Sequence, residues 1–268
     1  IGGSDHDSIN SVVETSDGGY VAGGYCKSSS IDLENGVSLT NKNSGYENGM
    51  LIKYSAEGEY EWAKVIGGSY SDSIQEVAET RDGGIIAGGD FRSSNKGNYD
   101  GMIIKYNSSG ECEWAKGIGG SSTDTITSVA ECSDGGIIAG GYFYSSSIDL
   151  GNGVSLTSKS LNDGMLIKYN SNGECEWAKG IGGWNNDKIQ SVAESSDGGY
   201  VAGGYFESSS IDLGNGVSLT SKGLSDGMII KYSAEGECEW AKGIGGSNSD
   251  YIQSVAETKD GDIIAGGY

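Results

Sequence analysis

A nine-residue stretch returns five times along this chain and constrains its fold more than any other feature. Each copy begins with Asp-Gly and contains Ala-Gly-Gly near its end, and the copies span 17–25, 82–90, 134–142, 197–205 and 260–268. The repeats themselves open with Ile-Gly-Gly at Ile1, Ile66, Ile118, Ile181 and Ile244, so their spacings are 65, 52, 63 and 63 residues. Periods of this size are typical of propellers, solenoids or arrays.

The first repeat holds four short apolar runs that are separated by turn residues. Asp-Gly-Gly at 17–19 forms a tight turn because Asp bonds its own backbone and Gly accepts positive φ. We therefore expect four antiparallel strands, at Ser8–Thr15, Tyr20–Cys26, Met50–Tyr54 and Glu59–Ile66. Four such strands make up one propeller blade.

The chain is therefore predicted to be an all-β propeller in which every repeat is one blade. Repeats 1 to 4 span 1–65, 66–117, 118–180 and 181–243, and a half repeat spans 244–268. A β-solenoid is the main alternative, but its coils usually repeat at about 20 to 30 residues. The half repeat supplies only two strands, so we expect a single domain that is a fragment of a longer array or that ends in an incomplete blade. Its edge at Ile263–Tyr268 is predicted to be open to pairing with another chain, which favours oligomers or polymers.

Three of the four full repeats carry an extra segment between their second and third strands. These segments, Ser30–Lys42, Ser147–Lys159 and Ser210–Lys222, alternate polar and apolar residues around a central Asn-Gly. Asn-Gly between alternating runs is the strongest short signal for a β-hairpin. Repeat 2 has only the short segment Ser93–Tyr99 at this place, which accounts for its 52-residue length. Three blades are therefore expected to bear a hairpin and one to lack it.

The net charge of −21 and the isoelectric point near 4.2 limit the classes of partner. Phosphate backbones and anionic lipid surfaces would be repelled, so no nucleic acid and no membrane surface is expected as a partner. No apolar run reaches the roughly 18 residues needed to cross a bilayer, and no signal peptide is visible. The chain starts at Ile1, so a leader peptide is left open.

The five cysteines are predicted to be free thiols. Cys112, Cys175 and Cys238 occupy the same place in successive repeats, and equivalent places lie too far apart for a disulfide. We expect them to be small buried apolar side chains, because no close metal-binding spacing such as Cys-x-x-Cys occurs. Free thiols favour a reducing or anaerobic setting.

Several segments recur in a fixed order and carry a resemblance. They include Ile-Gly-Gly-Ser at 1–4, Asp-Gly-Gly-Tyr-Val at 17–21, Ser-Leu-Thr at 38–40, Leu-Ile-Lys-Tyr at 51–54 and Trp-Ala-Lys at 62–64. This pattern resembles the SBBP-type β-propeller repeat of bacterial and archaeal surface or secreted proteins, over essentially the whole chain. The resemblance implies a propeller in a secreted or cell-surface setting, and it brings no catalytic residues.

The loops that follow the fourth strand of each repeat vary most, on the face that also carries the hairpins. Varied loops on a uniform framework are typical of a binding surface, although unconstrained loops also drift. Trp184 could stack on a sugar ring while Asn185 and Asn186 bond its hydroxyls, or it could pack on a neighbouring hairpin. The predicted ligand-binding residues are Trp184, Asn185, Asn186, Tyr70, Tyr251 and His6.

Other residues recur in every repeat and are interpreted as framework. The loop aspartates are expected to fix their loops through backbone N–H groups, since no calcium-binding loop pattern is present; they are Asp7, Asp72, Asp124, Asp187 and Asp250. Late-strand glutamates, such as Glu79, are expected to pair with late-strand lysines, such as Lys53. Trp62, Trp114, Trp177 and Trp240 are expected to pack between blades.

Enzyme chemistry has little support, since His6 is the only histidine and no phosphate-binding loop precedes a helix. We predict no catalytic residue, no metal site and no cofactor. The favoured function is a non-catalytic extracellular module that binds a protein or glycan, or that assembles. The alternatives are a lectin-like propeller that uses the loop face, and a propeller hydrolase or lyase.

Overall fold

The computed structural model describes residues 2–33, 36–41, 45–92 and 98–268, and it is all-β: none of these residues is helical. Consequently, the described part of the chain has no helix that could cross a membrane. The chain divides into two compact units, Ile1–Gly117 and Ile118–Tyr268. The boundary falls where the third repeat begins.

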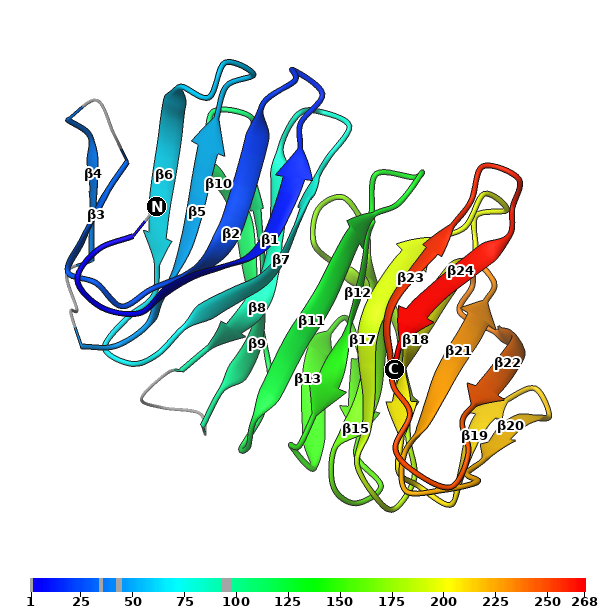
Figure 1. Ribbon diagram of the computed structural model, residues 1–268. Helices are drawn as coiled ribbons and strands as arrows, with labels where there is room; N and C mark the ends of the chain where they lie inside the picture. The colour runs from blue at the N-terminus through cyan, green and yellow to red at the C-terminus, as the bar shows by residue number, and fades with distance from the viewer. Residues whose placement is uncertain (1, 34–35, 42–44, 93–97) are drawn as a thin grey trace. The chain divides into compact units, whose positions relative to one another are not determined.

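Unit 1 contains two four-stranded antiparallel sheets, one for each repeat (Figure 1). The sheet of repeat 1 has the order β1-β2-β5-β6, formed by Asp7–Glu14, Tyr20–Cys26, Asn48–Tyr54 and Tyr60–Ile66. The sheet of repeat 2 has the order β7-β8-β9-β10, formed by Ser73–Glu79, Ile85–Phe91, Asp100–Tyr106 and Cys112–Ile118. A two-stranded sheet joins β3 (Ser30–Asp32) to β4 (Ser38–Thr40).

Unit 2 repeats this plan twice and adds a two-stranded sheet. The sheet of repeat 3 has the order β11-β12-β15-β16, formed by Asp124–Glu131, Ile137–Phe143, Asp163–Tyr169 and Cys175–Ile181. The sheet of repeat 4 has the order β17-β18-β21-β22, formed by Asp187–Glu194, Tyr200–Phe206, Asp226–Tyr232 and Cys238–Ile244. The half repeat pairs β23 (Ile252–Glu257) with β24 (Ile263–Gly267). All four strands predicted for repeat 1 are confirmed, with ends within two residues.

The inserted hairpins form where Asn-Gly predicts them in unit 2. They are β13–β14 (Ser147–Gly151 and Val154–Thr157) and β19–β20 (Ser210–Gly214 and Val217–Thr220). Asn152 and Gly153 have φ of 52° and 77°, the two positive values that a type I′ turn requires. In repeat 1 the strands β3 and β4 are present, whereas Asn35 lies outside the described residues, as does most of the short segment of repeat 2.

The Gly23-Gly24 pair of repeat 1 meets two packing requirements. A side chain on the first glycine, such as Gly23, would overlap Val77 and Ile74 on the first strand of the next repeat, so glycine lets the two sheets pack closely. A side chain on the second, such as Gly24, would overlap the backbone oxygen of Ser8, beside the bulge at Ile9–Ser11. The recurring motif is therefore a framework requirement rather than a phosphate-binding loop.

The predicted pairing with late-strand lysines is wrong for Glu79, Glu194 and Glu257. Glu79 instead accepts hydrogen bonds from the backbone N–H and the hydroxyl of Ser16 in the preceding repeat, at 2.8 and 2.9 Å. Glu194 and Glu257 bind Ser133 and Ser196 in the same way. A carboxylate at this position lies beside the exposed turn of the neighbouring sheet. The backbone N–H and the hydroxyl of the turn serine are its hydrogen-bond donors.

The four lysines lie against turn aspartates and fourth-strand glutamates of their own repeat. The Nζ atom of Lys168, whose side chain is only 2% exposed, lies 2.8 Å from Asp134 and 3.0 Å from Glu176. The same pairing fixes the equivalent turns of the other repeats, through Lys53–Asp17, Lys105–Asp82 and Lys231–Asp197.

Trp62 and Trp177 of the fourth strands pack on the next repeat, as predicted. Trp62 lies over Gly110 in unit 1, and Trp177 lies over Gly236 in unit 2. The indole N–H of Trp177 also donates to the backbone oxygen of Ala234 at 3.2 Å. A side chain on either glycine would overlap the indole ring.

Candidate ligand pocket between the first and second repeats

The loop aspartates organise the face on which the variable loops lie. Asp187 accepts bonds from the N–H of Gly183 in the loop before β17 and from the N–H and hydroxyl of Ser208 after β18. Asp72 joins the same two segments of repeat 2, because it accepts the N–H groups of Gly68 and Arg92, both at 2.9 Å. Burial raises the pKa of both carboxyl groups, while these donors lower it. The prediction that these aspartates fix their loops is confirmed.

In repeat 4 the hairpin β19–β20 covers the outer part of the face that the sheet turns toward repeat 3. Ile211 and Leu219 of the hairpin are 1% and 7% exposed and belong to one apolar core with Phe206, Met228 and Ile230. Leu219 also lies beside Gly243 on β22. The hairpin is thus a wedge that fills the outer rim between successive sheets.

Repeat 2 presents the same residues without a described wedge. Phe91, Met102 and Ile104 hold the places of Phe206, Met228 and Ile230, and Ile66 closes the space from the end of β6. A cavity of about 510 Å³ lies here, lined by Ile66–Tyr70, Asp72, Phe91, Arg92, Met102, Ile104 and Ala115–Gly117. This volume is within the range of small-molecule sites, about 300–1,000 Å³.

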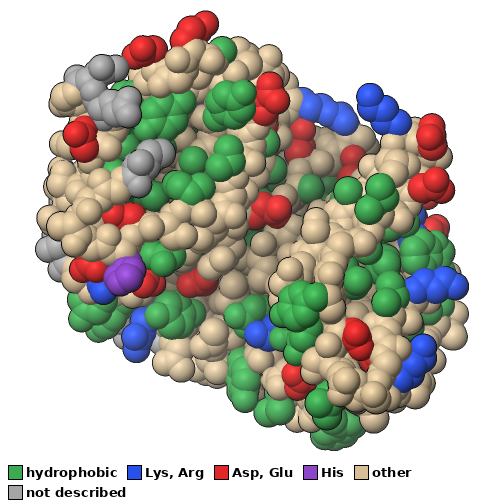
Figure 2. Space-filling model, in the orientation of Figure 1, with side chains coloured by type: hydrophobic (Ala, Val, Ile, Leu, Met, Phe, Trp, Pro, Cys, Tyr) green, Lys and Arg blue, Asp and Glu red, His purple; other side chains and the backbone are tan. Residues whose placement is uncertain are grey.

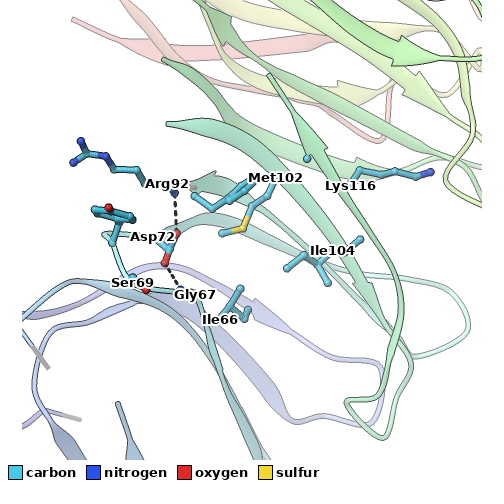
Figure 3. A pocket seen from close by; sticks show the side chains of 13 residues that line it. Ile66, Gly67, Ser69, Asp72, Arg92, Met102, Ile104 and Lys116 are labelled. Atoms are coloured by element: carbon cyan, nitrogen blue, oxygen red, sulfur yellow. Dashed lines mark hydrogen bonds between the residues drawn. The ribbon is translucent and has the colours of Figure 1, made fainter. Parts of the chain in front are cut away.

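The cavity draws on both sheets of unit 1 and on the loop between them (Figure 3). Met102 and Ile104 on β9 and Ile66 at the end of β6 direct their side chains into the same space, whereas the side chain of Lys116 extends away from it. The walls are thus apolar, and the loop residues 67–72 form one rim.

Repeat 2 also differs from its neighbours in the exposure of β10. Cys112 is exposed, whereas its equivalents Cys175 and Cys238 are each 5% exposed beneath hairpins. The prediction of a buried thiol is therefore wrong for Cys112, because no described hairpin covers β10. Burial raises the pKa of Cys175 to about 11, which makes that thiol inert.

A cation lies at the mouth of the cavity. The guanidinium of Arg92 lies 5.1 Å from the ring centre of Tyr70 and 5.8 Å from that of Tyr99. Tyr70 in turn meets the ring of Tyr46 edge-on at 6.1 Å. Among the described residues no carboxylate forms an ion pair with Arg92, so aromatic rings hold its charge in place.

The predicted site residues do not form one site. Tyr70 lines the cavity, whereas Trp184, Asn185 and Asn186 share a loop of unit 2. Trp184 is 77% exposed, but the amide of Asn185 donates to the backbone oxygen of Glu207 and that of Asn186 to its carboxylate at 2.8 Å.

The two remaining predicted residues lie in other surroundings. Tyr251 packs between the rings of Tyr205 and Tyr268, at 4.6 and 5.2 Å between centres. His6 is exposed at the surface, where histidine is purple in Figure 2, and its backbone oxygen accepts the N–H of Lys27.

Sequence reasoning missed Phe91, Arg92, Met102 and Ile104 as site residues. The available signal was the 52-residue spacing of repeat 2, which shows that a segment is shorter there. The spacing does not show which residues the longer segment covers in the other repeats.

A second hollow, of about 410 Å³, lies in unit 2 and contains several charged side chains. Its lining includes Asp134, Lys168, Glu176, Trp177 and Glu194. The ionic groups are already bonded to one another or to Ser133. Within the described ranges, no group of three or more His, Cys, Asp or Glu residues is placed to hold a metal ion.

Comparisons of sequence give one weak relationship. No protein-family model matches the chain, so its similarity to the SBBP-type repeat stays a prediction. The chain is similar to the regulatory protein FlaEY of Caulobacter vibrioides, with 27% identity over 143 residues. The match covers 53% of this chain and 15% of that relative's length.

Comparisons of structure give similar chains at low identity. Sqt1 from Chaetomium thermophilum has a TM-score of 0.47 at 15% identity, with 97% of this chain and 66% of that chain covered. The extracellular domain of a candidate one-component system protein from B. thetaiotaomicron has a TM-score of 0.42 at 14% identity, over 99% and 38% of the two chains. A variant of NanB sialidase from Streptococcus pneumoniae has a TM-score of 0.47 at 13% identity, over 86% and 35%.

Proposed function

We propose that this chain is a non-catalytic binding module of propeller type, and that the cavity of repeat 2 is its ligand site. The observation that carries the proposal is the aliphatic cavity of about 510 Å³ at the place that a hairpin fills in repeat 4. Asp72 is the one carboxylate in the lining, and its two oxygens accept backbone N–H groups. This arrangement supports binding rather than acid–base chemistry.

Cys112 provides a direct test, because it is the exposed thiol on β10. A trifluoromethyl label on Cys112 would report ligands through its fluorine resonance during a screen of mixed small molecules. We expect at least one chemical class to shift the resonance in the parent protein, and the shift to disappear in Ala115→Trp, which fills the cavity from an exposed position. A screen with no shift, or equal shifts in both proteins, would overturn the proposal.

The setting proposed for the module is secreted or on the cell surface. The support is the resemblance of its repeats to those of surface proteins. Detection of the parent protein in the medium or on intact cells, by surface proteolysis, would test it. Recovery only from the cytoplasm would contradict it.

A lectin-like role is the second candidate, and the 77% exposure of Trp184 favours it. Since the Asn185 and Asn186 amides are bound to Glu207, sugar hydroxyls would have to bond elsewhere or displace these bonds. A glycan array tests this role: binding that is lost in Trp184→Ala supports it, and unchanged binding rules out this loop.

Assembly through β24 is a separate proposal. Within the described residues β24 pairs with β23 alone, and Ile264 and Tyr268 are 60% and 73% exposed. Light scattering at several concentrations tests it. A mass that rises with concentration and falls in Ile264→Lys supports pairing of this edge with a second copy, whereas a constant monomer contradicts it.

A further inference from the structure

The space that the cavity occupies is shaped for aliphatic groups. In repeat 4 the equivalent space holds the side chains of Ile211 and Leu219, which pack on Phe206, Met228 and Ile230. Repeat 2 has Phe, Met and Ile at the same three places. An aliphatic ligand in repeat 2 would therefore pack on the same three residue types on which Ile211 and Leu219 pack in repeat 4.

The charged residue at the mouth of the cavity has the opposite sign to the residue at the equivalent position of repeat 4. Arg92 stands where repeat 4 has Glu207, and it is one of two arginines in a chain of net charge −21. Glu207 is engaged by Asn186, whereas the guanidinium of Arg92 rests on the rings of Tyr70 and Tyr99. Aromatic faces leave the N–H edges of a guanidinium available to an anion.

Asp72 does not compete for this guanidinium. Its oxygens are taken by the N–H groups of Gly68 and Arg92, and its side chain is buried. An incoming carboxylate at the mouth would thus find a positioned cation beside aliphatic walls.

We propose that the ligand of this cavity is an aliphatic carboxylate of medium chain length. The hydrocarbon chain lies on Phe91, Met102 and Ile104, and the carboxylate accepts hydrogen bonds from Arg92. This proposal rests on the proposed function of the cavity and adds the chemistry of its ligand.

Titration calorimetry with decanoate and 1-decanol, on the whole chain, tests both ends of the ligand. We expect decanoate to bind the parent protein. Arg92→Gln, a substitution at an exposed position, is expected to weaken decanoate binding about tenfold, as loss of one charged hydrogen bond would, and to leave 1-decanol binding within about twofold. Ala115→Trp is expected to abolish binding of both.

The outcomes separate this proposal from the proposed function. Equal losses for decanoate and 1-decanol in Arg92→Gln would overturn the carboxylate assignment. Binding of another chemical class, while decanoate does not bind, would overturn the whole proposal and leave the cavity a ligand site. Binding of a cyclic peptide with the sequence of Ser210–Thr220, without binding of decanoate, would assign the space to a hairpin of a second chain instead. Absence of every ligand would overturn the proposed function as well.

Discussion

Repeats 2 and 4 have the same framework and different rims. Their second and third strands pair in the same register, Ile85 with Tyr106 and Tyr200 with Tyr232. Repeat 4 covers its outer face with β19–β20, whereas the face of repeat 2 contains a cavity. The comparison shows that the strand pairing of the four-stranded sheet does not depend on a hairpin such as β19–β20. A segment outside the sheet decides whether the same apolar residues are buried core or line a cavity.

The largest expected effect is one that both repeats share. A side chain on Gly89 or Gly204 would overlap the backbone oxygen of Ser73 or Lys188. Gly89→Ala and Gly204→Ala should each cost on the order of 4 kcal/mol, because the strand must move. Urea unfolding would measure both, with Gly246→Ala as control, since a side chain there meets nothing. A mutant midpoint equal to that of the parent would break the claim of a common framework.

The next largest effect is a difference between equivalent methionines in the free-energy cost of substitution by alanine. Met228 is 0% exposed beneath the hairpin, and Met102 is 4% exposed beside the cavity. Met228→Ala should cost about 3 kcal/mol, whereas Met102→Ala should cost roughly 1 kcal/mol less because the cavity lies along one side of Met102. Urea unfolding of the two variants gives the comparison. Equal costs would mean that the face of repeat 2 is as well packed as that of repeat 4.

Asp90 makes the stability of repeat 2 depend on pH. It holds the place of Tyr205, and burial raises its pKa to about 6, although Gln75 donates to it at 3.1 Å. The folded carboxyl keeps its proton better than the unfolded one, so folded stability falls as the pH rises from about 4 to 6. Asp90→Asn should gain about 2 kcal/mol at pH 8 and nothing near pH 4. Thermal unfolding at both pH values measures this, and a pH-independent difference would refute the raised pKa.

The smallest expected effect comes from one alanine on each fourth strand. Ala241 packs against the core beneath the hairpin, whereas Ala115 is exposed in the cavity. Ala241→Leu should cost about 1 kcal/mol through overpacking. Ala115→Leu should change stability by less than about 0.5 kcal/mol. Melting temperatures of the pair would sharpen the comparison, and a reversed order would contradict it.

The strands and hairpins could be predicted because their causes are local. Asp-Gly-Gly and Asn-Gly specify turns, and alternating residues between them specify strands. The framework role of Trp62 and of the loop aspartates also followed from their regular recurrence. Glu79 was assigned the wrong partner, because the donors of Ser16 lie in the preceding repeat and no local rule brings the two together.

The cavity could not be predicted because it depends on a segment that is shorter in repeat 2. The sequence shows the shorter segment, but only packing shows that Ile211 and Leu219 cover the sheet in repeat 4. Trp184 was singled out for its residue type, and the engagement of Asn185 and Asn186 by Glu207 depends on the fold of the adjoining loop.

The most direct test of the account is a count of reactive thiols in the native protein. Cys112 is exposed and Cys26, Cys132, Cys175 and Cys238 are buried. We predict that one thiol reacts rapidly with Ellman's reagent, that peptide mapping identifies it as Cys112, and that all five react in denaturant. Slow reaction of Cys112, or equally rapid reaction of Cys175 and Cys238, would show that the rims of these repeats do not differ.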